Sequence, residues 1–246
     1  MLDNLKFQLD HHVADLVPKG GMEAEKAWKV VNNASFSKEL SFSRRLENLY
    51  FISAGIRNSS MFHPLSIEEI LQVRELAGRL GVGFVARKCG TIIFKVFLFD
   101  RSKRELASRI PDVYESMGFR EFIVAQITIA NLTGEFLDYP ECCRKWFLDH
   151  LMEGTDQDLE AHEALRKERR PDPRAYYLER FVPCSPRCGN AIRMGRRIEE
   201  ELGRIDPGLL KEYEILRLDH MRDVRNGVIL QEKRRRDELR SLGPRK

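Results

Sequence analysis

The chain has 246 residues, of which 42% are hydrophobic and 33% are charged, and its formal net charge is +4. This composition supplies a hydrophobic core and suits a soluble globular protein of one large domain or two small ones. No apolar run reaches the length of a membrane span, and the acidic residues Asp3, Asp10 and Asp15 exclude a secretory signal at the N-terminus. We therefore expect a cytoplasmic protein.

The net charge is unevenly distributed. Residues 222–246 contain nine Lys or Arg against four Asp or Glu, a net of +5, so residues 1–221 sum to −1. The body of the protein is close to neutral and its C-terminal tail is basic.

The first part of the chain is predicted to be helical over residues 2–17, 22–31 and 38–53. The pair His11-His12 lies on the first of these segments. Adjacent side chains face different sides of a helix, so these two residues are poor ligands for one metal ion. A capping box at Ser66 and Glu69 predicts a helix over residues 67–80 that stops near Gly81.

Two β-rich segments follow, over residues 82–88 and 91–98, with Cys89-Gly90 between them. Their Val, Ile and Phe content predicts a β-hairpin with a two-residue turn. We interpret Cys89 as a free surface thiol at the tip of this hairpin.

Further helices are predicted over residues 101–110, capped by Asp100, and over 121–137, which is too long for a strand. A charged helix over 158–170 and a last helix from Asp206-Pro207 to Leu242 complete the chain. The expected fold is mainly α with a small β-hairpin, an α+β arrangement. Three parts are expected: residues 1–118, a helical part at 119–210 centred on a cysteine cluster, and a long basic helix at 211–246.

Four of the five cysteines lie in two short segments that each begin with a proline-led turn. In the first, Pro140 opens a helix that runs to about Met152 and is capped by Tyr139. In the second, Ser185 is the predicted N-cap and Pro186 opens the helix. The thiols concerned are those of Cys142, Cys143, Cys184 and Cys188.

Three of these thiols are expected in the first turn of a helix, and the fourth lies beside one. The positive end of the helix dipole favours thiolate, which is the form that binds metals and attacks electrophiles. We predict that the two segments meet and that the four sulfurs lie within roughly 4 Å of one another if they bind one ion, given Zn–S bonds near 2.3 Å.

The two cysteine segments resemble those of an archaeal family of uncharacterised proteins that shares Tyr-Pro-x-Cys-Cys and Pro-Cys-Ser-x-x-Cys. The likeness covers residues 120–200. The family often has Gly before Tyr-Pro, where this chain has Asp138, and His before Pro-Cys, where this chain has Phe181-Val182. The resemblance implies an archaeal, cytoplasmic, cysteine-centred protein and assigns no activity to it.

Three interpretations of the cysteines remain open. Four thiolates satisfy tetrahedral zinc or an iron–sulfur cluster, and a cluster better tolerates the diverging side chains of two adjacent cysteines. Alternatively, a thiolate such as Cys143 acts in redox or nucleophilic chemistry and another cysteine resolves the product. The third interpretation is structural, with buried or disulfide-bonded cysteines in a helix contact.

The basic tail offers a separate hypothesis. A run of cations that binds phosphate groups without reading sequence is typical of RNA-binding or ribosome-associated proteins. The acidic Asp237 and Glu238 interrupt this run and no aromatic residue lies between its arginines, so we favour a solvated helix end as its interpretation. The candidate contacts are Lys233, Arg234, Arg235, Arg236 and Arg240.

Overall fold

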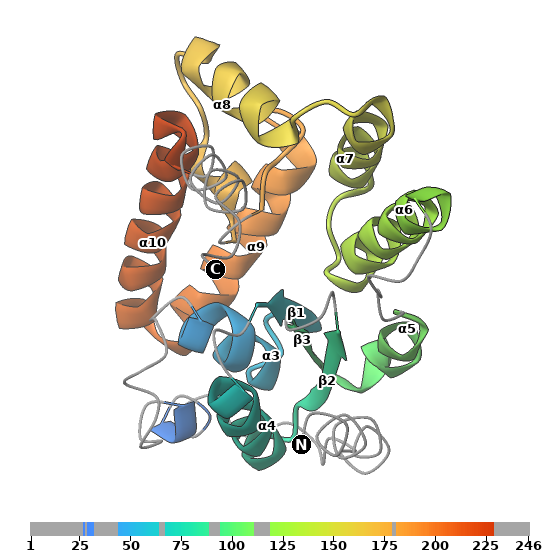
Figure 1. The fold of residues 1–246 in the computed structure, drawn as a ribbon. Helices are drawn as coiled ribbons and strands as arrows, with labels where there is room; N and C mark the ends of the chain where they lie inside the picture. Colours follow the sequence, from blue (N-terminus) through green and yellow to red (C-terminus); the bar gives the residue numbers. More distant parts are fainter. Residues whose placement is uncertain are drawn as a thin grey trace, which may run out of the picture. The chain divides into compact units, whose positions relative to one another are not determined.

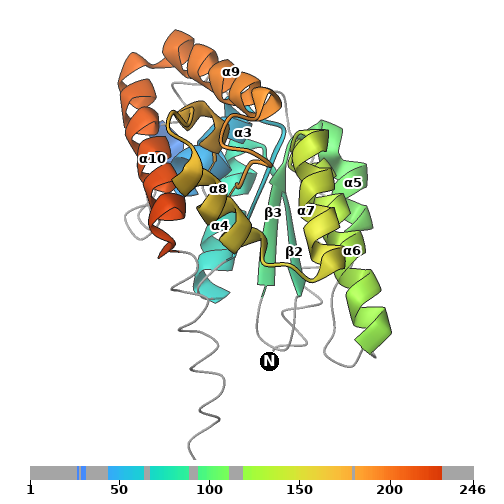
Figure 2. The same ribbon diagram turned by 90° about the horizontal axis from the view of Figure 1, so that it is seen from above.

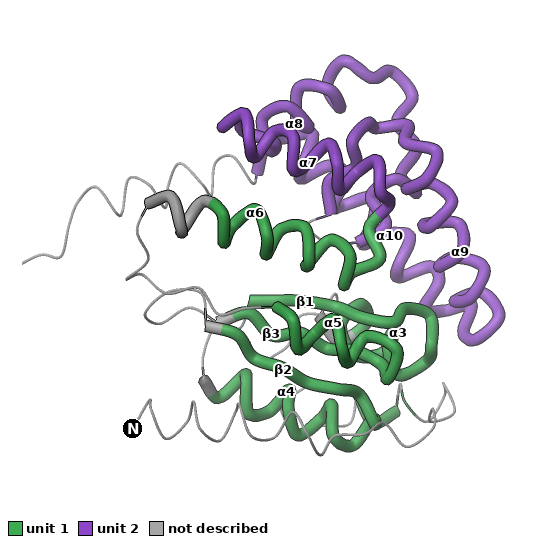
Figure 3. Tube along the Cα trace, turned by 90° about the vertical axis from the view of Figure 1, so that its right-hand side faces the viewer, with its two compact units in different colours: residues 1–139 green, residues 140–246 purple. Residues whose placement is uncertain are grey.

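The computed structural model describes residues 27, 29–31, 44–63, 67–88, 94–110, 119–178 and 181–228. The chain divides into two compact units, Met1–Tyr139 and Pro140–Lys246, which Figure 3 distinguishes by colour. Helices and one small antiparallel sheet make up the described residues, so the predicted mainly α fold with a small β component is confirmed.

Unit 1 is built around a three-stranded sheet, and Figure 2 shows two of its strands, β2 and β3, side by side. The sheet order is β1-β3-β2, and both pairings are antiparallel. Its elements are η2 (Arg44–Tyr50), α3 (Phe51–Ser53), β1 (Ser59–Phe62), α4 (Ile67–Leu80), β2 (Gly83–Lys88), β3 (Phe94–Phe99), η3 (Arg101–Lys103), α5 (Arg104–Arg109) and α6 (Phe119–Phe136).

The predicted hairpin corresponds to β2 and β3, and the first strand of the sheet was not predicted. Strand β1 is only four residues long and begins with two serines, so it lacks the run of aromatic and aliphatic residues that marks β3. Lys88 pairs with Phe94, which leaves residues 89–93 between the strands and excludes the predicted two-residue turn. Cys89 itself lies outside the described residues.

Helix α6 packs on the sheet through its C-terminal half. Phe136 is fully buried and meets Phe97 and Phe99 edge-on, with ring centroids 5.5 and 6.1 Å apart. Polar contacts reinforce this packing, because the Arg57 guanidinium donates to the Leu137 carbonyl at 3.2 Å. The prediction of a helix over 121–137 rather than a strand is therefore confirmed.

The chain leaves α6 through a left-handed residue, Asp138, whose φ is 54°. Glycine adopts this conformation at little cost, whereas a residue with a Cβ is strained there. Asp138 compensates through its carboxylate, which accepts a 2.5 Å bond from Lys103 Nζ. The tight turn delivers the chain to Tyr139-Pro140, where the second unit begins.

Unit 2 consists of helices joined by short loops (Figure 1). Helices α8 and α9 each contact α10, and the short helix η4 contacts both α9 and α10. The elements are α7 (Glu141–Glu153), α8 (Gln157–Lys167), η4 (Pro173–Tyr176), α9 (Gly189–Ile205) and α10 (Pro207–Asn226).

The core of unit 2 combines aromatic packing with hydrogen bonds and ion pairs between buried or half-buried groups. The Tyr213 hydroxyl donates to the Tyr177 carbonyl at 2.7 Å, and both residues are buried. The half-buried Glu199 carboxylate accepts from Arg174 Nε at 2.8 Å and also from the buried Arg217. Because a buried charge is costly unless it is paired, this three-residue network fixes how η4, α9 and α10 pack together.

Helix α10 ends at Asn226, whereas we expected one helix as far as Leu242. Gly227 adopts a left-handed φ of 67°, and its N–H bonds back to the carbonyls of Asp223 and Val224. This is the usual way in which a glycine terminates a helix. The predicted tail contacts, from Lys233 to Arg240, lie beyond the described residues and stay a prediction.

Candidate metal centre

The first pair of cysteines lies in the opening turn of α7, as predicted. Pro140 is the N-cap, one residue later than the predicted cap Tyr139, because its carbonyl accepts from Cys143 N–H at 2.9 Å and from Arg144 N–H at 3.0 Å. Cys142 and Cys143 therefore follow Glu141 as the second and third helical residues.

The second pair is positioned by a turn rather than by a helix. We expected the helix to open at Pro186, but α9 begins at Gly189 with Cys188 as its N-cap. Ser185 starts a single turn, in which its carbonyl accepts from Cys188 N–H at 2.9 Å. The Pro186 carbonyl accepts from Asp172 N–H at 3.3 Å, a residue far away in the sequence.

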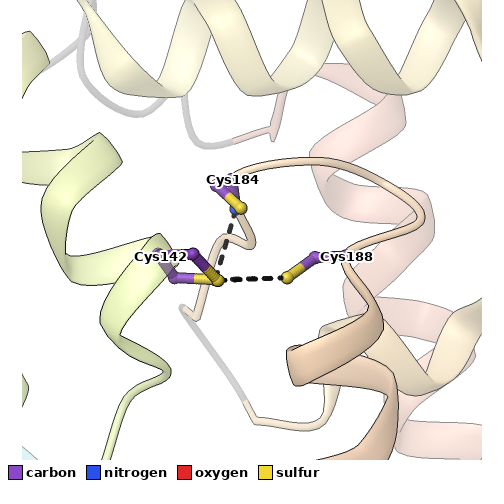
Figure 4. A group of neighbouring side chains, drawn as sticks. Cys142, Cys184 and Cys188 are labelled. Atoms are coloured by element: carbon purple, nitrogen blue, oxygen red, sulfur yellow. Dashed lines mark hydrogen bonds between the residues drawn. The ribbon is translucent and has the colours of Figure 1, made fainter.

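The two segments bring all four sulfurs together, so the predicted convergence is confirmed. The four Sγ atoms lie within 4.8 Å of one another. Cys142 Sγ lies 3.9 Å from Cys143 Sγ and 3.6 Å from Cys188 Sγ, and Cys143 Sγ lies 3.7 Å from Cys188 Sγ. Figure 4 shows the thiols of Cys142, Cys184 and Cys188 gathered between the start of α7 and the loop that leads into α9.

The cluster is half enclosed. Cys143 and Cys188 are buried, with 3% and 7% of their surface exposed, whereas Cys142 and Cys184 are partly exposed. None of the four is in a disulfide. A set of four reduced thiols with two buried members can enclose an ion while leaving a side open for its entry.

Two donors outside the thiols complete the site. The backbone N–H of Cys184 donates to Cys143 Sγ at 3.5 Å, and Asn190 Nδ2 donates to Cys142 Sγ at 3.3 Å. The Asn190 carbonyl oxygen in turn accepts from Arg193 Nη2. Hydrogen-bond donors and two helix N-termini thus face the sulfurs, an arrangement that stabilises negative charge on them.

The thiols differ in acidity. Burial raises the pKa of Cys143 and raises that of Cys184 to about 12. Burial also opposes ionisation of Cys142, but hydrogen bonds from Asn190 and then from the neighbouring thiols outweigh it and lower its pKa. Without a bound cation, Cys142 is therefore the first of these three thiols to ionise.

Sequence reasoning did not identify Asn190 as part of the site. Its role depends on α9 beginning at Gly189, which places residue 190 in the first turn beside Cys142. With the helix starting at Pro186, as we expected, the same residue would be a turn further along. The sequence signal that could have found it is the Cys-Gly-Asn order immediately before the amphipathic stretch of α9.

Comparison of the chain with protein-family models, with curated proteins and with solved structures found no match. Among the described helices, none is both long and apolar enough to cross a membrane. The functional argument therefore depends on the geometry of the site.

Replacing Asn190 tests its contact with the sulfur. Asn190→Asp keeps the shape of the side chain but exchanges the donor for a carboxylate beside Cys142. We expect metal affinity to fall about tenfold or more, the effect usual for the hydrogen-bond partners of metal ligands. The measurement is competition for zinc with a chromophoric chelator.

The Asn190→Asp substitution distinguishes the loss of the hydrogen bond to Cys142 from a loss of helix stability. An aspartate in the first turn is favourable for the helix dipole, so a loss of metal affinity cannot come from a weaker α9. Asn226→Asp, at the exposed end of α10, introduces the same charge elsewhere, so it is the matched control and should leave metal affinity unchanged. Equal affinity in the Asn190→Asp and wild-type proteins would remove Asn190 from the site.

The dependence of stability on pH should differ between metal-free and metal-bound protein. The ordinary pKa of a cysteine thiol is 9.0, and in the metal-free folded state the pKa values of Cys143 and Cys184 are raised above it. Above pH 9 the folded state therefore keeps protons on these two thiols that the unfolded state releases. The free energy of unfolding of the metal-free form should therefore decline from pH 9 towards pH 12. Bound thiolates hold no proton, so the metal-bound form should lack this decline and should instead lose stability in acid.

Chemical denaturation of both forms between neutral and alkaline pH provides the check. The partly buried Tyr139, whose pKa desolvation raises to about 12, adds the same alkaline decline to both forms, so the difference between the two curves isolates the thiols. Parallel curves for the two forms would contradict the assignment of the sulfurs as ligands.

Proposed function

We propose that unit 2 is a metal-binding module in which Cys142, Cys143, Cys184 and Cys188 hold a single Zn²⁺ ion. The observation that carries this proposal is the separation of the sulfurs, 3.6 to 3.9 Å in the three pairs of Cys142, Cys143 and Cys188. Four sulfurs at Zn–S bonds of 2.3 Å form a tetrahedron with edges of ~3.8 Å. Three of the thiols therefore already have the spacing of one ion's coordination shell, and all four sulfurs lie within 4.8 Å of one another.

The same distances favour one ion over an iron–sulfur cluster. In a four-iron cluster each cysteine binds a different iron at its own corner, so the sulfurs lie well outside the distances that one shared ion requires. Here all four sulfurs lie within 4.8 Å. The adjacent pair does not diverge either, because Cys142 and Cys143 occupy the first turn of α7 and their sulfurs are 3.9 Å apart.

The ion would act as a cross-link between distant parts of unit 2. Cys142 and Cys143 begin α7, whereas Cys188 caps α9 and lies 46 positions after Cys142. Helix α7 has Cys143 as its one buried residue, so apolar packing within the described residues contributes little to holding it. Metal binding supplies that attachment, and its free energy then becomes part of the folding free energy.

Metal analysis tests the proposal. Protein purified without chelators and under reducing conditions should contain about one zinc ion per chain and no acid-labile sulfide. Replacing the zinc by cobalt should give the intense visible absorption of a tetrahedral thiolate site. Several irons per chain with equimolar sulfide, or no metal at all, would contradict the assignment.

The lowered pKa of the partly exposed Cys142 supports a second candidate, a thiol that acts as a nucleophile. Titration of free thiols distinguishes the zinc site from the nucleophilic thiol. A zinc site should protect four of the five cysteines until the metal is removed, whereas a redox centre should leave Cys142 reactive in the protein as purified.

A further inference from the structure

Arginines are concentrated on one side of the cysteine loop and α9. Between Glu179 and Glu199 the sequence contains five arginines and no acidic residue. Four of the five are described, and all four are exposed. They are Arg187 in the loop and Arg193, Arg196 and Arg197 on the helix, and we call them the arginine face.

Two members of this face differ from Arg204 and Arg222, two exposed arginines of the same unit that have acidic partners. Arg204 pairs with Glu201 and Arg222 pairs with Asp219, each one helical turn away. By contrast, Arg196 and Arg197 form no ion pair within the part of the chain that the structure describes. Their positive charges are thus available to a partner.

The arginines of α9 lie in its first half, whereas Glu199, Glu200 and Glu201 follow in the second half, and the first turn has no acidic residue. Positive charge is therefore concentrated in the part of α9 that follows the cysteine loop.

We propose that the arginine face binds the phosphodiester backbone of a nucleic acid. Arg193, Arg196 and Arg197 are spaced i, i+3 and i+4, which places them on one side of the helix with Cβ atoms about 5–6 Å apart. That spacing lets the guanidinium groups contact neighbouring phosphates of one strand, and Arg187 adds a further exposed positive charge in the loop before the helix. Guanidinium groups suit phosphate because they donate two parallel hydrogen bonds.

Two features favour a nucleic acid over an anionic membrane. The exposed stripe of α9 from Gly189 to Glu200 carries glycine, asparagine, arginine and glutamate, with no apolar side chain to enter a bilayer. The C-terminal residues 222–246 add a net charge of +5 to the same chain. Attraction to a long polyanion needs only such charge, because released counterions drive it.

The test uses the full chain and a fluorescently labelled RNA of mixed sequence, with a DNA of the same sequence in parallel. The variant Arg196→Gln with Arg197→Gln removes two exposed charges that are remote from the thiols. We expect its affinity to fall on the order of tenfold at low salt, and the slope of log K against log salt to become shallower by roughly two. If the variant loses affinity for RNA and for DNA equally, the arginines contact only the phosphodiester backbone.

The matched control is Arg204→Gln with Arg222→Gln, which changes the net charge equally but removes arginines that already have acidic partners. It should leave the affinity within about twofold of wild type. Arg196→Lys with Arg197→Lys keeps the charge and should retain binding, and the zinc content of every variant should match wild type.

Three results would overturn the inference. The full chain could fail to bind either nucleic acid at low salt. The two glutamine variants could lose affinity equally, which would indicate general charge or the tail rather than this face. Binding to vesicles of anionic lipid, with no binding to nucleic acid, would assign the arginines to a membrane surface instead.

Discussion

Replacement of Cys188 by serine should release the metal and break the link between the starts of α7 and α9. Cys188 is 7% exposed, and its sulfur lies 3.6 and 3.7 Å from two of the other three sulfurs. Because metal binding is coupled to folding, the variant should lose its zinc and melt roughly 10 °C lower or more, as expected when about 2 kcal/mol is lost from a domain of this size. Metal analysis and calorimetry measure the two effects.

The matched control is Cys89→Ser, a cysteine of the other unit that is predicted to be a free surface thiol. It should alter neither metal content nor melting temperature. A Cys188→Ser protein that keeps its melting temperature while losing reactivity would favour the nucleophile interpretation over the metal. Equal destabilisation by the two variants would contradict a special role for the cluster.

Gly195→Ala should destabilise unit 2 strongly, although alanine is the better helix former. A Cβ on this buried residue of α9 would lie 2.2 Å from the Arg174 carbonyl oxygen, which belongs to the backbone of η4 and cannot rotate away. The two elements would have to separate, at a cost on the order of 3 kcal/mol, as is usual for overpacked cores. Denaturant unfolding of the variant measures this cost.

Gly203→Ala, on the same helix, should stabilise unit 2 rather than destabilise it. Its Cβ would meet Leu210 Cδ2 at 3.4 Å, an ordinary contact with the end of a flexible side chain. Replacing glycine by alanine in a helix interior then stabilises by about 1 kcal/mol. Similar effects of the two substitutions would show that α9 and η4 do not pack as closely as the structure has them.

The helices could be predicted from the sequence where neighbouring residues determine where each helix starts. Asp100, Pro140 and Asp206 mark helix starts through side-chain or backbone bonds within a few residues, and the structure has a helix at each. The apolar stripe of α9 is a local signal of the same kind, because Ala191 and Ile198 recur at helical spacing and both are buried. Such signals are contained in a short window of sequence.

The sequence did not predict the segments whose structure depends on residues far away along the chain. Pro186 has the local chemistry to open a helix, but α9 starts at Gly189, and the Pro186 carbonyl accepts from the N–H of the distant Asp172. Strand β1 exists because β3 offers it a partner edge, not because its own residues favour a strand. The convergence of the thiols was predictable from the two matched segments, whereas the Asn190 contact depends on the shifted helix start.

X-ray absorption at the metal edge tests the central claim most directly, because it reports the atoms that surround the ion. One zinc ion bound by Cys142, Cys143, Cys184 and Cys188 predicts a single shell of about four sulfurs near 2.3 Å, with no second metal close by. A shell that contains nitrogen or oxygen, or a short metal–metal distance, would contradict the four-thiolate site of one ion.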